Sequence, residues 1–297
     1  MANCLSCQRP VAVARATCLY CGAALPPEHL TAALAAAARE DAPAAARAAA
    51  ADRALVVLDL ADANPDTLGR ALGLPRYEAG LLAKRGGLHL HRVLDPAEAE
   101  AEAGRLGARG VTAVLVPEAE ARVRPLRATG GTRAEGSLTL RTEEGPVSLR
   151  RGDVFLVVQG PITREYQTSF KRKRVDTARL EEGYRVHLHR TRETRPVEID
   201  AANFEFGTTG TRSTRLEIDT WLGEIAGGAP RDDGFRRLPP ALGPAEPEPK
   251  GALSAAGSLG LVSRRRRGEG DEGSLVLDNV EQFRFYSGWR AAVERRR

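Results

Sequence analysis

Four cysteines lie near the start of this chain of 297 residues, and they are its only cysteines. They form two Cys-x-x-Cys pairs with ten residues between them: Cys4, Cys7, Cys18 and Cys21. Each pair can form a tight turn whose two thiolates point to one cation, and two such turns complete a closed tetrahedral shell. The spacing therefore predicts one Zn²⁺ per chain, in a structural rather than a catalytic role.

Two other chemistries are open to paired cysteines, namely disulfide bonds and a redox-active dithiol. The segment carries no signal peptide, and neither pair lies in the strand-to-helix setting of a thioredoxin-like site, which disfavours both. The runs Cys-Leu-Ser-Cys and Cys-Leu-Tyr-Cys-Gly resemble the small zinc ribbons at the N-termini of many bacterial proteins. This resemblance makes residues 1–27 a zinc ribbon. Such ribbons bind protein, RNA or DNA, or only hold an N-terminus in place.

Composition narrows the class of protein. The length exceeds the usual single-core size, so several units are expected. The formal net charge of +5 comes from 44 basic and 39 acidic residues that are interspersed, unlike the concentrated charge of a dedicated nucleic-acid binder. No uncharged run approaches the roughly 20 residues needed to cross a bilayer. We therefore expect a cytoplasmic protein that does not insert into membranes.

The segment 28–53 is rich in alanine, with scattered charges and a proline at Pro43. Proline ends a helix, so this segment is predicted to be a partly helical linker.

The next segment, 54–117, has the pattern of a small α/β module. Strands are predicted at Leu55–Leu60, Leu88–Leu94 and Val111–Val116. Between them, helices begin at Pro65, Pro75 and Pro96 and end near Gly73, Gly86 and Gly110. Asn64 is placed to cap the first helix, and the third helix is expected to bury Leu106. The predicted order is β-α-α-β-α-β.

This order resembles the C-terminal domain of the bacterial ribosomal stalk protein. The likeness rests on Gly73-Leu74, on Glu78-Ala79 and on the glycine between the last helix and the last strand. In that family a lysine-rich helical face engages translation factors. The resemblance therefore implies partner binding through Lys84 and Arg85, although Gly80 and Leu81 replace charged residues of the family pattern.

After a basic, glycine-containing linker at 118–136, the segment 137–297 is predicted to be rich in β-strands. The candidate strands are Ser137–Arg141, Pro146–Leu149, Asp153–Val158, Ile162–Tyr166, Tyr184–His189, Pro196–Ile199, Phe204–Phe206, Arg215–Ile218, Leu259–Val262 and Leu275–Leu277. A mobile Pro/Ala/Gly-rich insertion is expected near 238–257, and Ser287 is placed to cap a terminal helix. Short, closely spaced strands favour an antiparallel sandwich or barrel. Strands followed by a closing helix resemble a pleckstrin-homology-like barrel. The predicted fold class is thus α+β and multidomain.

Two basic clusters interrupt this part of the chain. The first consists of Lys171, Arg172, Lys173 and Arg174, and the second spans Arg264 to Arg267. Such clusters are typical of solvated hairpin tips, but the first could also meet a phosphate or an acidic protein surface.

Catalytic signatures are sparse. His187 and His189 share one face of a predicted strand, as do His89 and His91, so each pair could supply two imidazoles to a metal. No third ligand is indicated by the spacing, and imidazoles on the outer face of a strand are common without any ligand role. The chain has no glycine-rich phosphate loop, nucleophile elbow or Ser-His-Asp signature. It is therefore predicted not to be an enzyme.

Three functional hypotheses follow. The leading one is a non-catalytic zinc-ribbon adaptor or regulatory protein that binds a macromolecular partner, a protein first of all. The second is a nucleic-acid- or ribosome-associated regulator, favoured if the ribbon and the cluster 171–174 act together. The third is a metal-dependent enzyme that uses His187 and His189. Neither the partner nor the oligomeric state follows from the sequence.

Overall fold

The structure is a computed structural model that describes residues 2–3, 10–11, 53–170, 174–206, 211–212, 215–245 and 275–297. The chain divides into two compact units, Met1–Ala51 and Asp52–Arg297. In the first unit, β1 (Ala2–Asn3) pairs with β2 (Pro10–Val11) in antiparallel fashion. The four cysteines and the alanine-rich segment 28–52 lie outside the described residues, so the zinc ribbon and the linker remain predictions.

The α/β module forms in the predicted order. Its elements are β3 (Ala54–Asp59), α3 (Pro65–Leu72), α4 (Arg76–Arg85), β4 (Leu88–Leu94), α5 (Pro96–Gly107) and β5 (Ala113–Pro117). The sheet order is β4-β3-β5, and both strand pairs are antiparallel. The Asn64 side chain accepts hydrogen bonds from the backbone N–H groups of Asp66 and Thr67, which confirms the predicted cap. Gly73 ends α3 with a φ of 69°, a conformation that favours glycine.

The side chains on the two faces of β3 pack in two different hydrophobic cores. Val56 and Leu58 pack with Leu106 of α5 in the core of the module, and Leu106 is fully buried as predicted. Leu55 and Val57 point the other way and join a core that includes the C-terminal helix. The module is therefore packed into the same compact unit as the strand-rich part, rather than standing alone.

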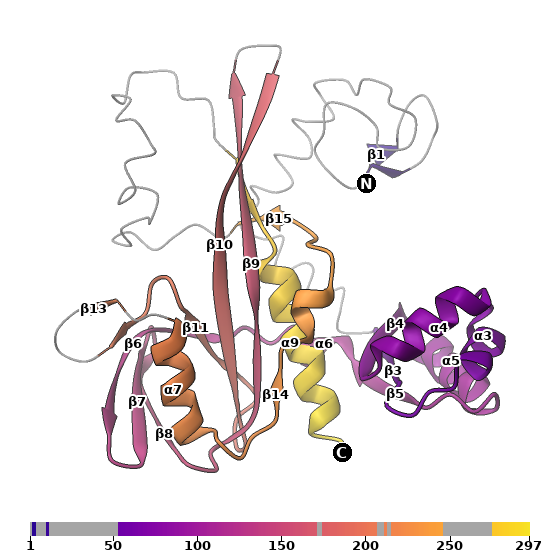
Figure 1. Ribbon diagram of the computed structural model, residues 1–297, viewed down its shortest axis with the longest axis horizontal. Helices are drawn as coiled ribbons and strands as arrows, with labels where there is room; N and C mark the ends of the chain where they lie inside the picture. The colour runs from indigo at the N-terminus through magenta and orange to yellow at the C-terminus, as the bar shows by residue number, and fades with distance from the viewer. Residues whose placement is uncertain are drawn as a thin grey trace. The chain divides into compact units, whose positions relative to one another are not determined.

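The remainder of the second unit is built on one curled, 11-stranded sheet. Its strands are β6 (Leu126–Ala134), β7 (Ser137–Thr142), β8 (Gly145–Arg150), β9 (Val154–Phe170), β10 (Arg174–Arg190), β11 (Val197–Asp200), β12 (Glu205–Phe206), β13 (Thr211–Arg212), β14 (Arg231–Asp232), β15 (Gly243–Pro244) and β16 (Leu275–Asp278). Helical segments are α6 (Glu118–Ala121), α7 (Arg215–Ile225), the short 3-10 turn η1 (Gly234–Arg237) and α9 (Val280–Glu294). The fold class is thus α+β. The long hairpin of β9 and β10 runs through the middle of this part (Figure 1).

Each face of the sheet is covered by a helix. Val157 of β9 packs with Ile218 and Leu222 of α7. Its neighbours Leu156 and Val158 point to the opposite face, where they share a core with α9. In Figure 1, α9 runs beside the β9–β10 hairpin, and α7 lies near β11.

Four sequence predictions are wrong in this part. The segment 118–136 is not a linker, because it contains α6 and β6, and β6 pairs with β7, β11 and β12. The candidate strand Arg215–Ile218 is the start of α7. The sheet is mixed rather than antiparallel, since β11 and β12 run parallel to β6 and β14 runs parallel to β9. Ser287 lies inside α9, and Asn279 occupies the N-cap position.

Two glycines explain why the sequence of β6 predicts a linker rather than a strand. A Cβ atom on Gly130 would come within 2.7 Å of the Glu205 carbonyl oxygen, and one on Gly131 within 3.0 Å of the Thr139 carbonyl oxygen. Neighbouring strands therefore approach so closely that only glycine fits, and the glycines that allow the strand also make its sequence resemble a linker.

The two strand candidates around residues 153–166 form the single strand β9, and the strand predicted at Leu275–Leu277 is confirmed as β16. The insertion predicted near 238–257 is described only to residue 245, and there β15 pairs with β16. The candidate strand Leu259–Val262 and the cluster Arg264–Arg267 lie outside the described residues. Over the part of the chain that the structure describes, no helix has the length and apolar character to span a membrane.

Candidate functional site

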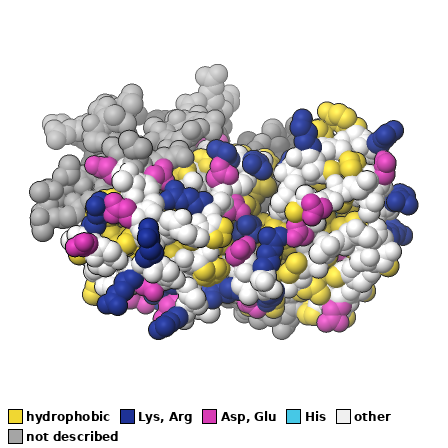
Figure 2. Space-filling model, turned by 60° about the horizontal axis from the view of Figure 1, so that its bottom comes forward, with side chains coloured by type: hydrophobic (Ala, Val, Ile, Leu, Met, Phe, Trp, Pro, Cys, Tyr) yellow, Lys and Arg dark blue, Asp and Glu magenta, His cyan; other side chains and the backbone are white. Residues whose placement is uncertain are grey.

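The residues proposed for partner binding fall in two places. Lys84 and Arg85 occupy the last turn of α4, and both side chains are exposed. Lys171, Arg172 and Lys173 lie outside the described residues, between the end of β9 and the start of β10, and only the backbone of Arg174 is described. On the face shown in Figure 2, basic and acidic side chains are intermixed, as the composition predicts.

The helix α4 carries an apolar pair on its exposed side. Tyr77 is 76% exposed and Leu81 is 51% exposed, and among the described residues these are the large hydrophobic side chains that stand open to solvent. They are four residues apart, so they lie on one face of the helix, and Lys84 follows Leu81 by three residues. We call Tyr77, Leu81, Lys84 and Arg85 the α4 face.

A cavity of about 420 Å³ lies beyond the end of α4, and we call it the α4–α9 cavity. Its walls come from three places: the segment from Arg85 to Leu90, the stretch that contains β14 and η1, and one side of α9. The apolar lining consists of Leu88, Leu90, Leu238, Phe285 and Trp289. Its size is within the range of small-molecule sites, about 300–1,000 Å³.

Both acidic groups of this cavity already have cationic partners. Asp232 accepts hydrogen bonds from the Tyr286 hydroxyl at 2.7 Å and from the Gly234 backbone N–H at 2.8 Å, and it also pairs with Nε of Arg290. Burial raises the pKa of Asp232, but Arg290 and these hydrogen bonds outweigh burial and hold the pKa below its ordinary value. Asp233 pairs with Arg236 at 2.5 Å.

The basic side chains that line the cavity have fewer ion-pair partners than its acidic side chains. Within the described residues, Arg85 and Arg237 take part in no ion pair, and Arg231 lies 3.9 Å from Asp219. His89 also lines the cavity, and burial, followed by the charge of Arg85, lowers its pKa. The cavity therefore has a cationic surplus at its exposed arginines, together with a neutral imidazole.

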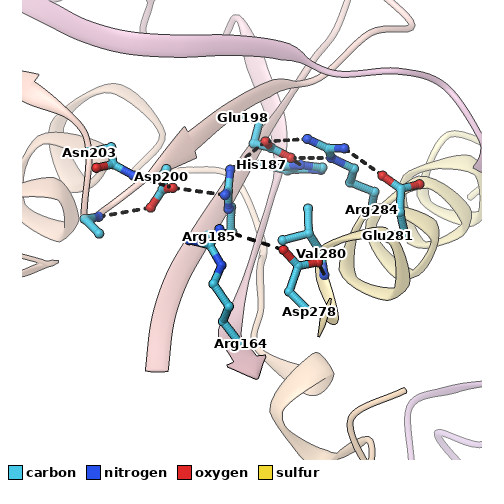
Figure 3. Close-up of polar contacts among 11 residues, drawn as sticks. Arg164, Arg185, His187, Glu198, Asp200, Asn203, Asp278, Val280, Glu281 and Arg284 are labelled. Atoms are coloured by element: carbon cyan, nitrogen blue, oxygen red, sulfur yellow. Dashed lines mark hydrogen bonds and ion pairs between the residues drawn. The ribbon is translucent and has the colours of Figure 1, made fainter. Parts of the chain in front are cut away.

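A second polar cluster is buried between the sheet and α9, and it is centred on Glu198 of β11 (Figure 3). Arg284 of α9 donates to both carboxylate oxygens of Glu198, at 2.8 Å and 2.9 Å. Arg185 donates to the same carboxylate at 2.8 Å, and His187 Nε2 lies 3.1 Å from it. Burial raises the pKa of Glu198, but these donors outweigh it and hold the pKa well below its ordinary value. The carboxylate is therefore ionised.

Ser287 joins the two histidines of β10 within this cluster. Its hydroxyl oxygen lies 2.9 Å from His187 Nδ1 and 2.8 Å from His189 Nε2. Burial lowers the pKa of both rings, so both are neutral at pH 7. The ionised Glu198 requires His187 to donate from Nε2, which leaves His187 Nδ1 to accept the Ser287 proton. The Ser287 oxygen then accepts from His189, and every polar hydrogen in the chain of contacts has one acceptor.

The three connected side chains Ser287, His187 and Glu198 have the residue types of a hydrolytic triad. Unlike the serine of such a triad, however, Ser287 is not accessible to a substrate. All three side chains are buried, with His187 1% exposed, so a substrate cannot reach the hydroxyl. The cluster therefore holds α9 against the sheet. This placement corrects the expectation that His187 and His189 lie on an outer strand face, because α9 covers that face.

His89 and His91, the other histidine pair, have different surroundings. His89 lines the α4–α9 cavity, as described above. His91 Nε2 lies 3.0 Å from Glu102, whose carboxylate also pairs with Arg105 at 2.7 Å. The hydrogen bond from Arg105 is the main cause that lowers the pKa of Glu102 to about 2. Among the described residues, no group of three or more histidine, cysteine or acidic side chains is placed to hold a metal ion.

The roles of Glu198 and Ser287 escaped the sequence analysis. Glu198 stands between Val197 and Ile199, which face α7, so it has the pattern of a solvent-facing strand residue. The available signal lay in α9 itself, where the apolar side chains recur every three or four residues, at Phe283, Tyr286, Trp289 and Val293, and indicate a helix buried against a second face.

Comparisons of this chain with families of proteins, with curated proteins and with solved structures find no match.

Proposed function

We propose that this chain is a non-catalytic adaptor or regulatory protein that binds a protein partner through the α4 face. The observation that carries the proposal is the exposed pair Tyr77 and Leu81, placed beside Lys84 and Arg85. Large apolar side chains exposed together are typical of interaction surfaces, and aromatic residues are common anchors there.

The chemistry of the face specifies the partner. Tyr77 and Leu81 offer an apolar contact one helical turn long, and Lys84 and Arg85 add two positive charges at its C-terminal end. The matching surface is an acidic segment that carries apolar side chains. Ala79 on the opposite side of α4 is fully buried, so the helix is held in position before a partner arrives.

The proposal includes the first unit as well. Residues 1–27 would form a ribbon that holds one structural Zn²⁺ through Cys4, Cys7, Cys18 and Cys21, joined by the segment 28–53 to the second unit. A cytoplasmic location and a pleckstrin-homology-like course of the strand-rich part belong to the same proposal. The spacing of the cysteines supports the zinc ribbon. The position of α9 after the strands supports the pleckstrin-homology-like course.

The test is quantitative capture from cytoplasmic extract with the full chain as bait. We expect a specific protein to be retained by the wild type, lost with Tyr77→Ala/Leu81→Ala, and reduced with Lys84→Glu/Arg85→Glu. Arg192→Glu, which reverses an exposed charge between β10 and β11, serves as the matched control and retains the protein.

Nuclease treatment and a salt titration separate the rival class. Capture that disappears with nuclease and weakens steeply with salt would favour the nucleic-acid- or ribosome-associated alternative, in which residues 171–174 take part. Retention of the same proteins by every α4 variant would refute the α4 face as the docking surface.

A further inference from the structure

We propose that the α4–α9 cavity is a binding site for a small organic anion with an aromatic body, such as an aromatic carboxylate or sulfonate. This inference does not rest on the proposed docking function, because the cavity shares only Arg85 with the α4 face.

The inner wall of the cavity is suited to binding an aromatic ring. Trp289 is only 3% exposed, and it packs edge-on against Tyr286 with ring centroids 5.0 Å apart. Phe285 and Leu88 contribute further apolar surface to the wall. Aromatic walls favour an aromatic guest through edge and face contacts beyond the burial of area alone. The volume of about 420 Å³ accommodates a fused two-ring system with one charged substituent.

The charge of the cavity selects an anion. Asp232 and Asp233 are each paired with an arginine, Arg290 and Arg236, that does not line the cavity. Their negative charges are therefore already neutralised, whereas the lining arginines Arg85 and Arg237 have no ion-pair partner within the described residues. The excess positive charge would repel a cation, whereas a carboxylate or sulfonate would pair with these arginines.

The geometry also orients the guest. Arg85 and Arg237 are exposed and belong to different walls, α4 and η1, whereas Trp289 is buried in α9. The anionic group would therefore remain near the exposed rim that carries Arg85 and Arg237, with the ring system directed toward Trp289. Guanidinium groups are well suited to this task, because they remain charged and bind planar oxyanions through paired hydrogen bonds.

The test compares two dyes that differ in charge: 8-anilinonaphthalene-1-sulfonate and its uncharged analogue N-phenyl-1-naphthylamine. The protein is the full chain with Trp221→Phe, which leaves Trp289 as the single tryptophan. We expect saturable binding of one sulfonate dye per chain with quenching of Trp289. The uncharged dye should bind at least about tenfold more weakly, since it lacks the hydrogen bonds to charged groups.

Variants then assign the charge selectivity to the cavity. Arg85→Gln and Arg237→Gln should each weaken binding of the sulfonate dye several-fold, and Arg85→Glu/Arg237→Glu by about tenfold or more, with no change for the uncharged dye. Arg192→Glu is the charge-matched control and should bind as the wild type does. Unchanged cooperative melting of each variant distinguishes a lost site from the dye binding of a partly unfolded chain.

Three results would overturn the inference: no saturable binding, equal affinity for the two dyes, or undiminished sulfonate binding by the double charge-reversal variant. A competition arm with 1-naphthoate and inorganic phosphate completes the test. Displacement of the dye by 1-naphthoate supports the inference, whereas displacement by phosphate alone contradicts the need for an aromatic body. Failure here is distinguishable from failure of the docking proposal, because Tyr77 and Leu81 do not line the cavity and Arg237 is not part of the α4 face.

Discussion

The hydroxyl oxygen of Ser287, in the middle of α9, lies 2.9 Å from Nδ1 of His187 on β10, 100 residues earlier in the chain. Both side chains are buried. In the neutral imidazole, Nδ1 accepts the hydroxyl proton while Nε2 donates to Glu198, whereas protonation of the ring would leave the hydroxyl hydrogen without this acceptor. The protonation state of two imidazoles is thereby linked to the attachment of α9.

Stability should therefore fall as the pH drops from 7 toward 5. The folded pKa values of His187 and His189 lie below the ordinary value of 6.5, so below pH 6.5 the unfolded chain binds more protons than the folded chain. Each histidine then lowers the free energy of unfolding by up to about 1.4 kcal/mol per pH unit. Urea titrations across this range measure the slope.

His189→Gln supplies the matched variant for this measurement, because the amide keeps a donor for Ser287 and does not titrate. Its slope between pH 6.5 and 5 should be shallower than that of the wild type. The window lies above the ordinary pKa of 4.5 for Glu198, so loss of the carboxylate charge does not contribute to it. Equal slopes would show that His189 is not held neutral in the folded protein.

The close approach of α9 to α6 should make Gly288 intolerant of a side chain. A Cβ atom there would lie 2.0 Å from the Ala121 carbonyl oxygen, so Gly288→Ala must displace one helix. Overpacking of this kind costs about 1–3 kcal/mol, and we expect thermal melting to fall accordingly. Gly104→Ala is the control, since its Cβ meets nothing within 4 Å, and it should stabilise the chain by up to about 1 kcal/mol. Equal effects of the two substitutions would contradict the helix contact.

The core of the α/β module gives a third expectation. Leu106 is fully buried, and Leu106→Ala should lower the free energy of unfolding by about 2–5 kcal/mol. Leu81→Ala removes the same atoms from an exposed position and should change stability by less than about 0.5 kcal/mol. Denaturant melts of the two variants provide the comparison. Similar losses would mean that the register of α4 or α5 differs from the one described.

Elemental analysis tests the zinc prediction: one Zn²⁺ per chain is expected, and Cys4→Ser/Cys18→Ser should abolish it. Since residues 1–51 form a compact unit of their own, removal of the metal should leave the melting of the second unit unchanged. Metal retained by the double variant would exclude the four-cysteine site.

The sequence predicted the α/β module well because its signals are local. Asn64, Pro96 and Gly73 act within one turn of their own helix ends, so their meaning does not depend on distant residues. The same is true of Lys84 and Arg85, which could be placed on a helix without knowledge of the rest of the fold.

Features decided by distant neighbours could not be predicted in this way. Gly130 and Gly131 lie in a strand whose neighbours Glu205 and Thr139 leave no room for a Cβ atom, and Glu198 is buried where α9 covers the sheet. The α4–α9 cavity is a further case, since Arg85 and Arg237 lie far apart in the chain and line one cavity only because of the tertiary packing.

The contact of the final residues with the first strand of the module has a consequence for synthesis. Arg297 pairs with Asp59, 238 residues earlier, and α9 buries Leu55 and Val57 of β3. A chain that grows from its N-terminus completes the module long before it makes α9. During translation these two side chains therefore lack their native cover, and the second unit can complete its packing only after α9 has left the ribosome.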